Sequence, residues 1–135
     1  MWQQRREKVI LAIEAGQTGL STRKLVLESF GYNVLAAASC SEAIRLLEEH
    51  SIDAALLDAS ANDIPLDKLS AHIKAKKGVP IVLVGDSAFI PNELRGTVDA
   101  AMEKLRDPHI VVEILDKLLN IADSRGADGK AIDKP

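Results

Sequence analysis

Apolar residues in this chain form short runs, separated by longer segments in which apolar positions recur at helical spacing. Two of the runs, residues 9–13 and 81–84, are apolar throughout. Such continuous runs indicate strands that are buried on both faces of a sheet. Five strands are expected in all, at 9–13, 32–38, 53–58, 81–84 and, with the weakest pattern, 97–103.

The segments between these strands predict helices. Leu25, Val26 and Phe30 are spaced to share one helix face over residues 21–30, and Gly31 stands where a C-capping glycine would. Further helices are expected after Ser39, which has capping-box spacing with Glu42, over 66–76, at 92–95, and from an N-cap at Asp107 and Pro108 to residue 122.

Strands that alternate with helices favour an open parallel sheet between two helical layers. Right-handed crossovers then give a doubly wound topology. We therefore expect an α/β fold, a three-layer α/β/α sandwich of the flavodoxin-like class, with a five-stranded parallel sheet of order 2-1-3-4-5. The domain should cover residues 8–122, after an N-terminal extension at 1–7 and before a disordered polar tail at 123–135.

The composition limits the cellular compartment and the classes of partner that are expected for this domain. A length of 135 residues suits one hydrophobic core, and the net charge of −3 offers no basic surplus for nucleic acid. The single cysteine, Cys40, excludes an internal disulfide and fits a reducing compartment. The apolar run from Val9 to Ile13 is too short for a signal peptide or a membrane span. We therefore expect a cytoplasmic protein without nucleic-acid or membrane partners.

Charged residues follow three of the expected strands. Glu14 closes the first strand, Asp58 closes the third, and Lys104 follows the fifth. In the order 2-1-3-4-5 the first and third strands are neighbours, so both carboxylates should meet in one crevice at the carboxyl ends of the strands. Lys104 can reach the same crevice from the other side. A pair of carboxylates there could also bind a divalent cation through oxygen ligands.

Several segments resemble the receiver domain of two-component response regulators, the CheY-like family. The phosphoacceptor strand is matched by IDAALLD, which puts Asp58 at the acceptor position. The second strand and helix are matched by GYNVLAAASCSEAIRLL, and the lysine segment by KLRDP at 104–108. The resemblance covers roughly residues 8–121, and it implies phosphoryl transfer to Asp58 from a histidine kinase or a small phosphodonor.

The resemblance also assigns roles to single residues. Asp58 would be the nucleophile and a ligand of Mg²⁺, Ser60 would lend a backbone carbonyl to the metal, and Glu14 would add a carboxylate. Lys104 would contact a phosphoryl oxygen. The expected partners are a sensor histidine kinase or phosphotransfer protein and a downstream regulatory protein.

Part of the family's active-site pattern is missing. Ala15 stands in place of the second carboxylate of the acidic pair, so Mg²⁺ binding should be weak or absent. Gly85 offers no hydroxyl after the fourth strand, and Ala100 or Ala101 replaces the aromatic residue of the fifth. Smaller departures are Leu105 in place of the proline after the lysine, Ala61-Asn62 in place of a Met-Pro, and a shortened 85–96 segment. We expect slow or absent phosphorylation, and no conformational readout of the usual kind.

The leading interpretation is a stand-alone divergent receiver domain, which is no enzyme, accepts a phosphoryl group on Asp58 and acts through protein contacts. The alternative is a pseudo-receiver that binds proteins without phosphorylation, through helix 107–122 and its neighbours. A small hydrolase or nucleotide-binding enzyme is disfavoured because no nucleophile–base pair or phosphate-binding motif is found. His50, His72 and His109 lack metal-ligand spacing and are expected at the surface.

Overall fold

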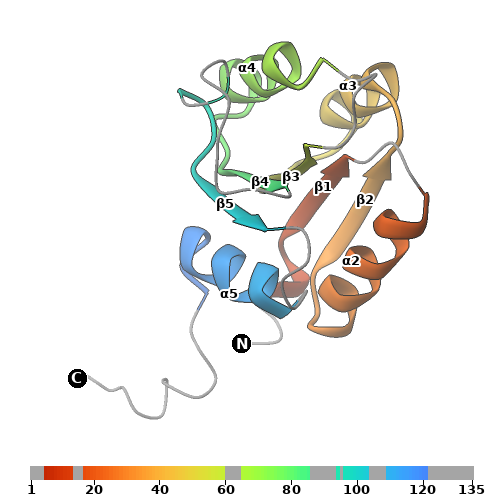
Figure 1. The fold of residues 1–135 in the computed structure, drawn as a ribbon, viewed down its shortest axis with the longest axis vertical. Helices are drawn as coiled ribbons and strands as arrows, with labels where there is room; N and C mark the ends of the chain where they lie inside the picture. Colours follow the sequence, from red (N-terminus) through yellow and green to blue (C-terminus); the bar gives the residue numbers. More distant parts are fainter. Residues whose placement is uncertain are drawn as a thin grey trace.

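A five-stranded parallel sheet forms the centre of the molecule (Figure 1). The computed structural model describes residues 5–13, 17–59, 65–85, 94, 96–103 and 109–121, with the backbone alone described at 17–22 and 103. The strands are β1 (Val9–Ile13), β2 (Asn33–Ala37), β3 (Ala54–Asp58), β4 (Ile81–Gly85) and β5 (Ala100–Glu103). Their order, β2-β1-β3-β4-β5, confirms the predicted flavodoxin-like topology.

Helices cover both faces of this sheet (Figure 1). They are α2 (Gln17–Ser29), α3 (Cys40–Glu49), α4 (Leu66–Lys76) and α5 (His109–Leu118). Helices α3 and α4 pack on one face, where their apolar residues form a single core cluster with Leu11, Leu57 and Leu83. Helices α2 and α5 pack on the other face, against residues such as Ile10, Leu56 and Val84. Successive strand residues thus alternate between the two helical layers, as the period of a strand requires.

Local capping signals in the sequence act as expected. Ser39 caps α3, because its hydroxyl accepts a hydrogen bond from the backbone N–H of Glu42 at 3.1 Å. The carboxylate of Glu42 in turn accepts from the N–H of Ala38 at 2.9 Å. Gly31 follows α2 with a φ of 103°, a conformation that glycine adopts without steric cost.

Helix α2 departs from the prediction in two respects. It begins at Gln17, whereas the helix was expected over residues 21–30. Its buried face also differs in part: Val26 and Phe30 pack against the core as expected, but Leu25 is 65% exposed, and Arg23 and Leu27 are buried. Arg23 and Leu27 are four residues apart and therefore lie on the same face of the helix. The spacing of apolar residues alone could not predict that an arginine is buried on this face of α2.

The N-terminal segment contacts α5 through a largely buried polar cluster. The Nη2 and Nε atoms of Arg5 lie 2.6 and 3.1 Å from the two carboxylate oxygens of Asp116. Tyr32 donates its hydroxyl to the same carboxylate at 2.6 Å. Burial, together with this hydrogen bond, raises the pKa of Tyr32 well above its ordinary value. The bond to Asp116 also raises the pKa of Arg5.

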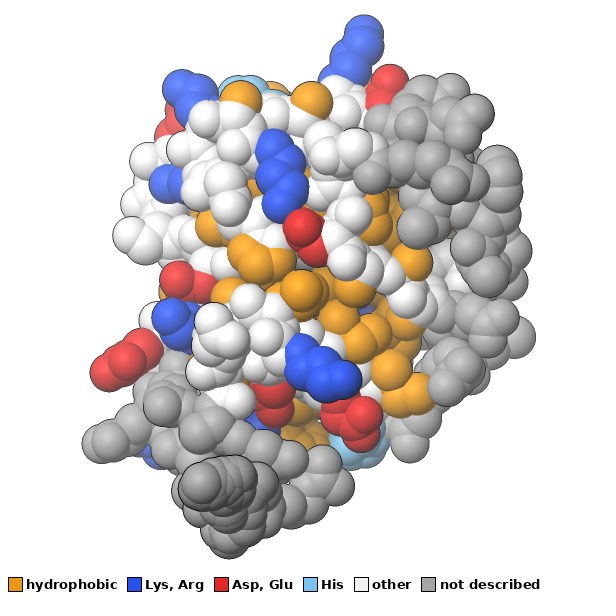
Figure 2. Space-filling model, turned by 90° about the vertical axis from the view of Figure 1, so that its left-hand side faces the viewer, with side chains coloured by type: hydrophobic (Ala, Val, Ile, Leu, Met, Phe, Trp, Pro, Cys, Tyr) orange, Lys and Arg blue, Asp and Glu red, His pale blue; other side chains and the backbone are white. Residues whose placement is uncertain are grey.

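Strand β5 forms one edge of the sheet. Figure 2 looks onto this side of the molecule and shows hydrophobic side chains gathered across its middle, with charged side chains above and below. Among the described residues, no helix has both the length and the hydrophobicity needed to cross a membrane. Of the helix expected at 92–95 only Leu94 is described, and both the expected start of the last helix at Asp107 and the tail at 123–135 lie outside the described residues.

Candidate functional site

Asp58 is the last residue of β3, which lies in the middle of the sheet. Every residue of this strand is buried, Asp58 included, and Asp58 pairs in register with Val84 of β4. Strand alternation decides which helical layer the carboxylate faces. Ala54 and Leu56 pack under α2 and α5, so Asp58, two positions further on, faces the same layer.

An arginine from α2 meets this carboxylate. The Nη2 atom of Arg23 donates a hydrogen bond to Oδ2 of Asp58 at 2.7 Å, and the two side chains are 8% and 5% exposed. Both charged groups are therefore taken out of water as a hydrogen-bonded ion pair, because either of them alone would be costly to bury. This contact helps a buried strand to end on an ionised acid.

Arg23 was not foreseen as a site residue. The signal was present in the sequence, since Arg23 precedes the apolar Leu27 by one helical turn and Asp58 follows Leu56 by two strand positions. These two spacings become informative only after α2 is known to cover the face that holds Leu56. The start of the helix at Gln17 and its side of the sheet supply that knowledge.

The other site residues predicted from the sequence lie outside the described residues: Glu14, Ser60 and Lys104. Their described chain neighbours are informative nevertheless. Ile13 pairs with Leu57 across β1 and β3, which confirms the expected adjacency of the first and third strands. Glu103 pairs with Gly85, and these two residues end β5 and β4.

The described residues do not fit a Mg²⁺ ion. No group of three His, Cys, Asp or Glu side chains that could hold a metal is found among residues 5–13, 17–59, 65–85, 94, 96–103 and 109–121. Mg²⁺ prefers carboxylate and water oxygens in a near-octahedral shell. Here one carboxylate oxygen of Asp58 already accepts from a guanidinium at 2.7 Å, and a cation so close repels a dication.

Two departures from the family pattern fall on described residues of β4 and β5. Gly85 ends β4, and a Cβ atom placed on it would come within 3.3 Å of the Cβ of Ala59. Ala100 and Ala101 begin β5, where the family has an aromatic residue. At these described positions the chain has neither the hydroxyl nor the aromatic ring of the family pattern.

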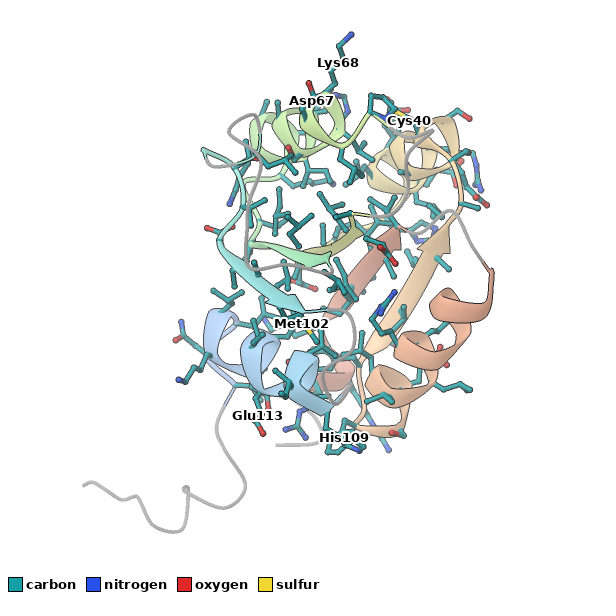
Figure 3. All side chains as sticks on the ribbon, in the orientation of Figure 1. Cys40, Asp67, Lys68, Met102, His109 and Glu113 are labelled. Carbon is teal, nitrogen blue, oxygen red and sulfur yellow. The ribbon has the colours of Figure 1, made fainter. Side chains whose placement is uncertain are left out.

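The remaining reactive side chains lie apart from Asp58. Cys40 is half-buried at the start of α3 and packs against the core cluster under α3 and α4 (Figure 3). His50 is exposed as expected, whereas His72 is half-buried. His109, at the start of α5, is exposed and meets the ring of Phe30 edge-on, with 5.4 Å between ring centroids (Figure 3).

The solved structures similar to this one include several receiver domains. A CheY-like receiver domain from Methanospirillum hungatei JF-1 has a TM-score of 0.73 and 26% identity, over 84% of this chain and 94% of its own. A two-component response regulator from Clostridium difficile has a TM-score of 0.77 and 23% identity, over 87% and 100%. The receiver domain of a signal transduction histidine kinase from Syntrophus aciditrophicus has a TM-score of 0.72 and 20% identity, over 87% of this chain and 96% of its own.

No protein-family model matches the chain, and no curated protein sequence matches it either. The structural similarity nevertheless extends over nearly the whole of these receiver domains, with the strand order and the aspartate at the end of β3 in common with the predicted pattern. The resemblance inferred from the sequence is therefore confirmed at the level of the fold: this chain has the fold of the CheY-like response regulator receiver domains.

Proposed function

We propose that this chain is a receiver domain of two-component signalling, with Asp58 at its phosphoacceptor position and with output through protein contacts. The observation that carries the proposal is the place of Asp58, an acid at the carboxyl end of the middle strand of a 2-1-3-4-5 sheet. In open α/β sheets, ligands bind in the crevice beyond the carboxyl ends of the strands.

Strand alternation supports a common site for the other proposed residues. Glu14 follows Ala12 by two positions, and Lys104 follows Met102 by two, just as Asp58 follows Leu56. Ala12, Leu56 and Met102 all pack under α2 and α5. Glu14 and Lys104 are therefore proposed to join Asp58 on that side of the sheet, and Ser60 to offer its backbone carbonyl there.

The proposed chemistry is one phosphoryl transfer. An oxygen of the Asp58 carboxylate forms a bond to phosphorus, while the bond from phosphorus to the donor's leaving group breaks and the leaving group departs with the electron pair. Lys104 is proposed to contact a phosphoryl oxygen and to balance its charge. We expect no multiple-turnover activity on a substrate, because the reaction modifies the protein itself.

The ion pair between Arg23 and Asp58 favours a second candidate, a pseudo-receiver that binds proteins without phosphorylation. The pair engages one oxygen of the carboxylate and buries it. Gly85 also lacks the hydroxyl that would contact a phosphoryl group. In either candidate the partners are proposed to be a sensor kinase or phosphotransfer protein and a downstream regulator. One similar structure is itself a receiver domain of a histidine kinase.

Intact-mass spectrometry after incubation with acetyl phosphate separates the two candidates. The expected result for the receiver is an adduct of one phosphoryl group in the wild type, formed slowly and absent from Asp58→Asn. An adduct that persists in Asp58→Asn would refute Asp58 as the acceptor. If neither acetyl phosphate nor a phosphorylated phosphotransfer protein yields an adduct, the pseudo-receiver remains, and the affinity of the wild type for a kinase must then be the same with and without acetyl phosphate.

A further inference from the structure

We propose that Arg23 is the resident cation of the Asp58 site and takes the place of a divalent metal ion there. The inference deepens the proposed function and rests on it, because it states how the acceptor carboxylate is held when no metal is bound. It starts from the disagreement between the described residues and a Mg²⁺ site.

The burial of this pair distinguishes it from surface ion pairs. The side chains of Arg23 and Asp58 are 8% and 5% exposed, whereas those of Lys24 and Glu28, on the same helix, are 37% and 39% exposed. Exposed pairs contribute little and form without consequence for a fold. Burying a guanidinium is costly unless a negative or acceptor group meets it, and Asp58 offers its carboxylate to Arg23 at 2.7 Å.

The geometry gives Arg23 the electrostatic role of a bound cation. Its guanidinium reaches the carboxylate from α2, on the layer that Asp58 faces, and donates at 2.7 Å, a short charge-assisted hydrogen bond. A dication on the same carboxylate would lie beside a fixed positive charge in a buried site, where repulsion is poorly screened. Arg23 therefore neutralises Asp58 and excludes the metal at the same time.

A Mg²⁺ titration of the wild type tests the exclusion directly. Backbone amide signals of Asp58 and Ala59 are followed by NMR in uniformly ¹⁵N-labelled protein, with NaCl at matched ionic strength as reference. We expect no saturable Mg²⁺-specific shift at these amides. A saturable shift in the wild type would overturn the inference, and this measurement depends on no variant.

Arg23→Gln tests whether Arg23 is the cause. We expect the variant to gain a saturable Mg²⁺ response, with an apparent Kd at least about tenfold lower than any Kd measured for the wild type. A tenfold change in Kd corresponds to about 1.4 kcal/mol of binding free energy. Arg5→Gln is the matched control, because it also breaks an arginine–aspartate pair that is largely shielded from solvent, with side chains 10% and 17% exposed. Arg5 precedes β1, so this pair lies at the amino ends of the strands, opposite to Asp58. If Arg23→Gln does not fold, Arg23→Met replaces it.

Three outcomes oppose the inference: metal binding in the wild type, no gain in the Arg23 variant, or an equal gain in Arg5→Gln. The phosphoryl adduct is measured separately. A wild type that binds Mg²⁺ and also forms the adduct keeps the proposed function and loses the role of Arg23. A wild type that ignores Mg²⁺ while Arg23→Gln binds it supports the inference, even when no adduct forms.

Discussion

Breaking the ion pair between Arg23 and Asp58 should lower the stability of the whole domain. In Arg23→Met the side chain keeps most of its apolar length, but the buried carboxylate of Asp58 loses the guanidinium at 2.7 Å. Two unit charges about 4 Å apart attract by about 4 kcal/mol at the effective dielectric suited to such sites. Measured losses after removal of one partner of a buried pair are about 3–5 kcal/mol. We expect a loss of this size, which is a large part of the roughly 5–15 kcal/mol that holds a domain folded.

Urea unfolding followed by circular dichroism measures this loss at neutral pH. The wild type, Arg23→Met, Asp58→Asn and the double variant form a cycle, and the double variant should lose clearly less than the sum of the single losses. Lys24→Met serves as the control on the same helix, because it breaks an exposed pair and should cost at most about 0.5 kcal/mol. A loss below about 1 kcal/mol in Arg23→Met, or additive single effects, would show that the pair is not the buried unit described here.

Three further predictions concern other parts of the fold. Burial and the hydrogen bond to Asp116 raise the pKa of Tyr32 in the folded state, so its protonated form stabilises the fold. This contribution is complete below the unfolded-state pKa of about 10 and is lost as the pH rises toward the folded-state pKa. The free energy of unfolding, measured over a pH series, should therefore fall more steeply above about pH 10 in the wild type than in Tyr32→Phe. Ser39→Ala should cost about 1 kcal/mol in chemical denaturation, through the lost N-cap of α3. Gly85→Ser should be destabilising by about 1 kcal/mol, because its Cβ meets that of Ala59 at 3.3 Å, and the penalty should shrink in an Ala59→Gly background; equal penalties in both backgrounds would contradict the contact.

The sheet could be predicted from the sequence because its signals are local and redundant. Apolar runs such as 81–84, a glycine with positive φ at Gly31 and a capping serine at Ser39 each agree with the fold on their own. The topology followed from strand–helix alternation and the handedness of crossovers. The position of Asp58 at the end of β3 followed in turn, since it needs only the end of one strand.

The partner of Asp58 could not be predicted in the same way. Arg23 and Asp58 are separated by 35 positions, and their contact depends on which face of the sheet α2 covers and on where that helix begins. Apolar spacing gave the wrong face for Leu25, because the buried stripe of α2 includes a charged residue. Sequence patterns indicate which positions are apolar, whereas a buried ion pair is visible only as two polar residues that interrupt two separate patterns.

Charge balance connects the substitution at Ala15 with the arginine in α2. In the family pattern, an acidic pair and the acceptor aspartate carry one more negative charge than the two carboxylates proposed here, and only a lysine and a metal dication offset them. With alanine at position 15, the proposed site holds Glu14 and Asp58 against Arg23 and Lys104, so its formal charges cancel without a metal. A buried site gains little from a further dication once its charges cancel, and it must still strip the ion of water. On this proposal Ala15 and Arg23 act together on the charge of the site, and Ala15→Asp or Arg23→Gln alone should leave it with one unbalanced negative charge.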